Sequence, residues 1–174
     1  MGINPDVRES LVADSRGRAF LDGKLKLPAE ALESFRDSIH FKPDNCEPYL
    51  GMAKAILAIE GDDIQEAVVG MKKYFELNPK NGTADAYATL GQVAGLNVEC
   101  DAAFEAVEKA LQLDPDFAQA YWDLGQVLIR KGLHDKASDC YKKTDSWMQE
   151  HMPVVPELQR FGVEATQLLS KLPH

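Results

Sequence analysis

The sequence predicts an all-α protein, an α-solenoid of about four helical hairpins followed by a C-terminal capping helix. Three observations predict this fold. Residues 84–93 are closely repeated at 118–127, with every matching residue displaced by 34 positions. Prolines recur at a regular interval, and so do small residues (Pro43, Pro79 and Pro115; Ala31, Ala67, Ala103 and Ala137). A fixed period of this size is typical of stacked repeats, in which each unit buries its apolar face against a neighbour.

Apolar side chains at helical spacing predict the helices of the first half of the chain. Residues 1–9 are polar and are expected to form a lead-in with little structure. Pro28 suits the first turn of a helix, because the N–H that it lacks would have no partner there. The predicted helices are 11–22, 29–41, 46–59 and 64–77, and the apolar face of the last one is Ala67, Val68, Met71 and Phe75.

Two further hairpins and a single helix are predicted in the second half. Asn81-Gly82 is a turn signal, and Asp101 is expected to be the N-cap of a helix because its side chain can accept from free N–H groups. The predicted helices are 84–96, 101–113, 118–131, 134–149 and 157–171. The resulting organisation is a lead-in at 1–9, four repeats at 10–45, 46–83, 84–117 and 118–151, and a capping helix within 152–174.

The duplicated stretch also predicts how its helices pack. Tyr87, Leu90 and Ala94 fall on one face of a helix and are expected to be core residues. Gly91 and Ala103 are small, which lets two antiparallel helices approach closely.

This pattern resembles the tetratricopeptide repeat, a helix–turn–helix unit of about 34 residues, and the resemblance implies a right-handed α-solenoid. The resemblance covers about residues 10–149 and is most specific in the third and fourth repeats. Arg16 stands where the family prefers an apolar residue, and Tyr74 where it prefers a small one. The residues that carry the resemblance are Tyr87, Leu90, Gly91, Ala103, Ala110, Pro115, Tyr121, Leu124, Gly125, Leu128, Gly132, Ala137 and Tyr141.

Composition excludes several classes of function. The net charge of −9 argues against binding to nucleic acid, which needs clustered Lys and Arg. No apolar run is long enough to predict insertion into a membrane. The three scattered cysteines suggest a reducing compartment, so we expect a cytoplasmic protein. No metal-ligand spacing, phosphate loop or nucleophile motif is present, so neither a cofactor nor an enzymatic activity is predicted.

The resemblance implies an adaptor whose first helices line a concave groove for a peptide or partner segment. Groove positions are expected one residue away from the core stripe of each first helix. Arg18 and Lys54 would favour an acidic ligand end, and Trp122 an apolar side chain. The three rows are Arg18, Lys54, Gln92 and Gln126; Asp14, Leu50, Ala88 and Trp122; and Ser15, Gly51, Thr89 and Asp123.

Other interpretations stay open at this point. Arg18 and Lys54 can be solvated surface charges, and Trp122 can pack against the last helix. The set of Lys, Asn and Arg side chains with which some family members bind chaperone carboxylates is absent in both possible registers, so chaperone binding is not expected. The alternatives to an adaptor are a self-assembling solenoid, with a possible homo-oligomer, and the interaction domain of a longer protein.

Overall fold

The computed structural model describes residues 4–23, 27–59, 64–97 and 99–114, together with isolated positions between 120 and 142. Within residues 5–113 of this part lie α1 (Pro5–Asp22), α2 (Pro28–Phe41), α3 (Glu47–Ile59), α4 (Ile64–Leu77), α5 (Ala84–Leu96) and α6 (Cys100–Leu113). Every regular element described is helical, which confirms the all-α prediction. The predicted helices 118–131 and 134–149 are described only at isolated positions, and 157–171 lies outside the described residues.

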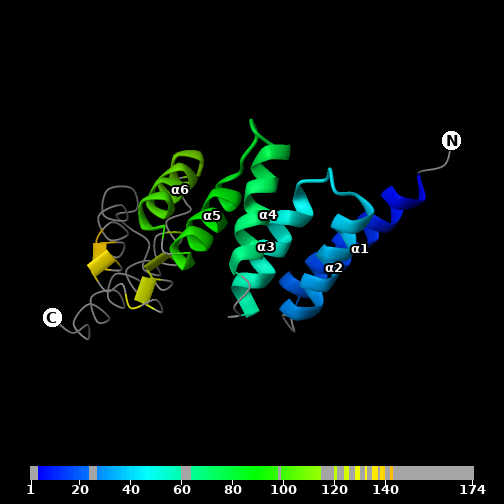
Figure 1. Ribbon diagram of the computed structural model, residues 1–174, viewed down its shortest axis with the longest axis horizontal. Coiled ribbons are helices and arrows are strands. Elements are labelled where there is room, and N and C mark those ends of the chain that lie inside the picture. Colours follow the sequence, from blue (N-terminus) through cyan, green and yellow to red (C-terminus); the bar gives the residue numbers. More distant parts are fainter. Residues whose placement is uncertain are drawn as a thin grey trace, which may run out of the picture. The chain divides into compact units, whose positions relative to one another are not determined.

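The chain divides into two compact units, Met1–Gly82 and Thr83–His174. In the first unit, α1 packs against α2 and α3 packs against α4, so that each pair forms a hairpin (Figure 1). The two hairpins meet because α3 also packs against α2 and contacts α1. In the second unit, α5 and α6 form a hairpin of the same kind.

The first helix begins earlier than the sequence predicts. Asn4 is its N-cap, and the Asn4 side-chain oxygen accepts a hydrogen bond of 2.9 Å from the Asp6 N–H. Pro5 then occupies the first turn, where a missing N–H costs nothing. The expectation of little structure is therefore wrong for residues 5–9. Ser10 and Ser38 hold this end of α1 on α2, with their buried Oγ atoms 3.0 Å apart.

The caps of the second unit also differ from expectation. Asp101 is not an N-cap, because α6 begins one residue earlier, at Cys100, after a cap at Glu99 that makes no side-chain hydrogen bond. Asp101 is instead an acidic residue in the first turn, where it complements the helix dipole. Thr83 caps α5: its side chain accepts from the Ala86 N–H at 3.1 Å.

Glycines stand where helices cross most closely. The Phe35 ring lies between α1 and α3, and a methyl group added at Gly51 would overlap it. A methyl group added at Gly17 would lie 2.8 Å from the same ring. In the second unit, a methyl group at Gly91 would lie 2.6 Å from Val107 and 3.2 Å from the Ala103 carbonyl oxygen. The close approach predicted at Gly91 and Ala103 is thus confirmed.

The buried face of α4 is rotated from the predicted one. Ala67 and Met71 are buried as expected, whereas Val68 and Phe75 are only half-buried. Gly70 and Tyr74 take their places, and Tyr74 is completely buried. In α5, Ala94 is buried, but Tyr87 and Leu90 are half-buried. Tyr87 packs against the edge of an apolar cluster that includes Val107, Leu124 and Leu128, with the Lys109 ammonium 5.3 Å from its ring centre.

A two-pronged ion pair joins the two hairpins of the first unit on their second helices. Arg36 of α2 donates from Nε to Glu66 of α4 at 3.0 Å and from a terminal nitrogen to the other carboxylate oxygen at 2.5 Å. Glu33 accepts a third hydrogen bond from Arg36 at 2.6 Å. The hydrogen bond to Glu66 raises the pKa of the Arg36 guanidinium, so this cation stays protonated.

Candidate partner-binding surface

Arg18 is the centre of the predicted groove surface on the first unit. Its Nε donates to Asp14 Oδ2 at 3.0 Å, one turn back on α1. A terminal nitrogen donates to Glu47 Oε2 at 3.4 Å, in the first turn of α3. The arginine therefore bridges two first helices, while 52% of its side chain remains exposed. This bridge brings together two predicted site residues and one that was not predicted.

Asp14 is more enclosed than a groove residue was expected to be. Only 12% of its side chain is exposed. Its second oxygen, Oδ1, is buried and has no hydrogen-bond partner in the described structure. Because a buried charge needs a partner, Arg18 stabilises the Asp14 carboxylate, and Asp14 in turn positions the Arg18 guanidinium.

The other groove positions on α3, and Ser15 on α1, differ in their surroundings. Leu50 is buried and so belongs to the core rather than to an open surface. Lys54 is half-buried and already interacts with neighbouring residues. Gly51 lies against the Phe35 ring, which a side chain at this position would overlap. Its counterpart Ser15 on α1 is exposed, and the Ser15 hydroxyl donates to the Leu11 carbonyl oxygen at 2.8 Å.

In the second unit, the same rows lie on α5. Thr89 is buried, and its hydroxyl donates to the Asp85 carbonyl oxygen at 2.8 Å. Ala88 belongs to the buried apolar cluster of that unit. Gln92 is half-buried and interacts with neighbouring groups. The remaining predicted site residues, Trp122, Asp123 and Gln126, lie outside the described residues.

Glu47 is the residue that sequence reasoning missed. It lies three positions before Leu50, just as Leu11 lies three positions before Asp14. Extending the predicted rows by one helical turn toward the start of each helix finds it, because positions three apart share a face. The ion pair between Arg18 and Glu47 was not predictable from the predicted rows, because the two residues are far apart in the sequence.

Cys46 lies beside this acidic residue. Partial burial raises the pKa of the Cys46 thiol, and the Glu47 carboxylate raises it further. The thiolate is the reactive form, so a raised pKa lowers its population at neutral pH. We expect alkylation of Cys46 by iodoacetamide, followed by mass spectrometry of its peptide, to accelerate only above the pH at which an ordinary thiol ionises.

Replacing Glu47 with glutamine is expected to move that pH profile downward and to speed alkylation at pH 8. The reason is that the substitution removes a negative charge that opposes ionisation. Glu76→Gln is the matched control, because Glu76 is an exposed carboxylate on α4 that pairs with Lys73. An unchanged Cys46 profile in Glu47→Gln would show that the carboxylate does not act on the thiol.

Neither a metal centre nor a membrane helix is found in the parts of the chain that the structure describes. No group of three or more His, Cys, Asp or Glu residues there is arranged to hold a metal ion. None of the helices described is long and apolar enough to cross a membrane.

Helical hairpins that pack on one another through small residues define the class of helical-repeat scaffolds. Comparison with known proteins indicates one family within this class. Residues 99–158 match the family model described as tetratricopeptide repeat. This match supports, over those residues, the resemblance to tetratricopeptide repeat proteins that the sequence predicts.

One curated relative is named for the same repeat. Small glutamine-rich tetratricopeptide repeat-containing protein 2 of Mycosarcoma maydis is 30% identical over 91 residues, which are 49% of this chain. The match spans 24% of the length of that relative.

Solved structures share the fold. Two crystal structures of MamA, each 29% identical, have TM-scores of 0.60 and 0.61; the matches cover 83% and 84% of this chain and 81% and 79% of those chains. A thermophilic tetratricopeptide repeat protein from Thermus thermophilus is 23% identical, with a TM-score of 0.64 over 91% of this chain and 81% of that one. At 23% identity the likeness shows the fold alone. The predicted α-solenoid class is confirmed.

Proposed function

We propose that the chain is a non-catalytic adaptor of the cytoplasm that binds an extended protein segment on the surface where α1 meets α3. The arrangement of Arg18 carries this proposal. Asp14 and Glu47 hold its guanidinium across two helices, while about half of the side chain faces solvent. A guanidinium has five N–H donors, so the two carboxylates leave donors for a ligand. A held arginine also loses less conformational entropy when a ligand binds.

The same arrangement refines the expected ligand. Two carboxylates already balance the Arg18 charge, so an acidic chain end gains less there than the sequence alone suggests. Main-chain carbonyl groups of an extended segment suit the remaining donors better. Lys54 lies in the same row on α3 and adds a second cation along the path. We therefore favour a partner segment recognised through its backbone.

The test is partner capture from the native cell extract with an Arg18→Gln/Lys54→Gln variant beside the wild-type protein. Glutamine keeps much of the side-chain length and helix propensity but removes the charge. Arg8→Gln/Lys72→Gln is the matched control, since it removes one exposed arginine and one exposed lysine elsewhere on the same unit. Captured segments are then synthesised as peptides and titrated by calorimetry.

We expect wild-type dissociation constants in the micromolar range, and a loss of roughly tenfold or more in the Arg18→Gln/Lys54→Gln variant, as for lost hydrogen bonds to charged groups. The control is expected to bind like the wild type. Equal binding by all three proteins would remove these residues from the site. Light scattering on the same samples tests the alternative of self-assembly. A mass several times that of one chain, without a captured partner, would favour a homo-oligomer.

A further inference from the structure

The second hairpin of the first unit receives α2 on a defined surface. Gly51 marks it on α3, because Phe35 of α2 packs there. Pro48 and Ala55 lie three positions before and four after Gly51, hence on the same side of α3, and both are buried. On α4, Glu66 accepts two hydrogen bonds from Arg36 of α2. An apolar strip and one carboxylate thus dock the apolar and basic residues of a helix.

The first hairpin carries the same surface without an occupant among the residues that the structure describes. The equivalent residues, 36 positions earlier, are Val12, Ser15 and Ala19 on α1 and Glu30 on α2. All four are exposed, and 54% of Val12 is accessible to solvent. Whereas Glu66 is paired with Arg36, Glu30 makes no ion pair with any residue that the structure describes.

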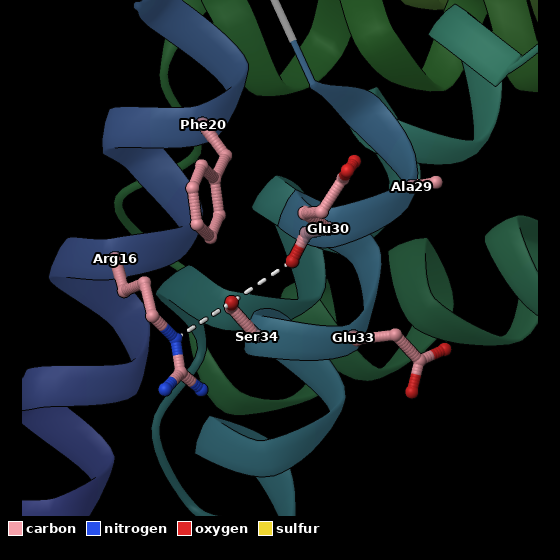
Figure 2. A pocket seen from close by; sticks show the side chains of 6 residues that line it. All are labelled: Arg16, Phe20, Ala29, Glu30, Glu33 and Ser34. Atoms are coloured by element: carbon pink, nitrogen blue, oxygen red, sulfur yellow. Dashed lines mark hydrogen bonds between the residues drawn. The ribbon is translucent and has the colours of Figure 1, made fainter.

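An open pocket of about 480 Å³ adjoins Glu30 between α1 and α2 (Figure 2). The Phe20 ring forms one wall, and the stem of Glu30 lies across from it (Figure 2). Arg16 also lines the pocket, but its charge is already met by Asp37 at 2.8 Å, and its Nε donates to Ser34 at 2.9 Å. The pocket therefore combines an apolar wall with a carboxylate at its rim, and that carboxylate has no ion-pair partner in the described part of the chain.

We propose that this surface docks an amphipathic helix of a protein partner in the way that the second hairpin docks α2. Apolar residues of the partner pack on Val12 and Ala19, and a basic residue extends along the pocket to Glu30. An aliphatic stem suits the Phe20 wall, and a cationic end suits the carboxylate. Because Ser15 stands where the second hairpin has glycine, a large ring cannot approach as closely as Phe35 does. The partner helix thus carries an aliphatic residue directly before its arginine or lysine.

The probe for this proposal is a stapled, fluorescently labelled peptide of residues 28–41 with Phe35→Leu, since α2 is the helix that occupies the equivalent surface. A second peptide carries Arg36→Glu in addition. Each is titrated by anisotropy against the wild-type protein, a Glu30→Lys variant and a Glu76→Lys control. Glu76 is an exposed carboxylate on α4, so its reversal changes the net charge equally without touching the proposed surface.

We expect the arginine peptide to bind the wild type and the Glu76→Lys control, and to lose at least tenfold in affinity toward Glu30→Lys. The glutamate peptide is expected to recover affinity for Glu30→Lys, because the charges are then exchanged. An affinity that does not depend on the charge of residue 30, or that changes equally in the Glu76→Lys control, would overturn the proposal.

Two further variants separate this surface from its alternatives. Arg18→Gln/Lys54→Gln is expected to bind the arginine peptide normally; a loss there would place the peptide on the α1–α3 surface and overturn the assignment. Val12→Glu adds a negative charge that would attract a basic peptide, but it removes an apolar contact, so we expect weaker binding. Tighter binding would show that only general electrostatic attraction acts and would overturn the proposal. A concentration-dependent dimer in the absence of peptide, lost in Glu30→Lys, would assign the surface to a second copy of the chain instead of a different partner.

Discussion

Replacing Phe35 with alanine is expected to lower the unfolding free energy of the first unit by about 3–5 kcal/mol, the range for a large aromatic deleted from a core. The side chain is only 1% exposed and fills the space between Gly17 of α1 and Gly51 of α3. Its removal takes away one of the contacts between the two hairpins as well as packing within the first. Gly17 and Gly51 have no side chains, so neither of them fills the space that the ring leaves.

Urea unfolding followed by circular dichroism measures this effect. Phe41→Ala is the matched control, because Phe41 lies on the same helix but is 39% exposed, and its loss is expected to cost about 1 kcal/mol or less. A cost at Phe35 no larger than at Phe41 would contradict the packing described here. Gly51→Ala should also destabilise, by about 1–3 kcal/mol, since its methyl group would meet the ring. Combining it with Phe35→Leu is expected to recover part of that loss.

The hairpin architecture was predictable because apolar residues, small residues and prolines recur at regular intervals in the sequence. Helix α4 begins and ends where apolar spacing and Pro79 place it, and α5 likewise matches its predicted range. The start of α1 was not predictable by the same means, because residues 5–9 are mostly polar and carry no apolar period. A capping argument at Asn4 and Pro5 finds it, since local hydrogen bonds rather than burial set that end.

The buried face of α4 shows a second limit. A family pattern that expects a small residue at position 74 treats Tyr74 as an exception to be tolerated, whereas the structure buries it fully. Gly70, one turn earlier on the same buried face, has no side chain and lies against the end of Met52. Which residues share a buried face depends on three-dimensional packing, which a single sequence does not display.

The candidate surface was predictable in location but not in its charge balance. Helical phase identified Asp14 and Arg18 as residues of one face, and the structure pairs them directly. Phase gives no information about Glu47, which reaches Arg18 from the next hairpin. The expectation of an acidic ligand end depended on counting Arg18 as an unmatched cation. The affinity expected for such a ligand end falls once two carboxylates are found beside it.

Replacing Tyr74 with alanine is the other substitution expected to cost about 3–5 kcal/mol, by the same loss of a buried aromatic. Tyr74 has no exposed surface, and its ring meets Phe75 edge to face with centroids 5.1 Å apart. Its hydroxyl accepts a hydrogen bond of 3.3 Å from the Asn78 side-chain nitrogen. Because that bond is long and half-exposed, Tyr74→Phe is expected to cost about 1 kcal/mol or less.

The neighbouring aromatic residue supplies the control for this prediction. Phase along the sequence places Phe75 in the core, whereas the structure leaves it half-buried and buries Tyr74 instead. Urea melts of Tyr74→Ala and Phe75→Ala therefore decide between the two faces of α4. The structure requires the larger loss of unfolding free energy at Tyr74, because the area removed from water is greater there. A larger loss at Phe75 would restore the face that the apolar spacing predicts and would rotate α4 relative to the position described.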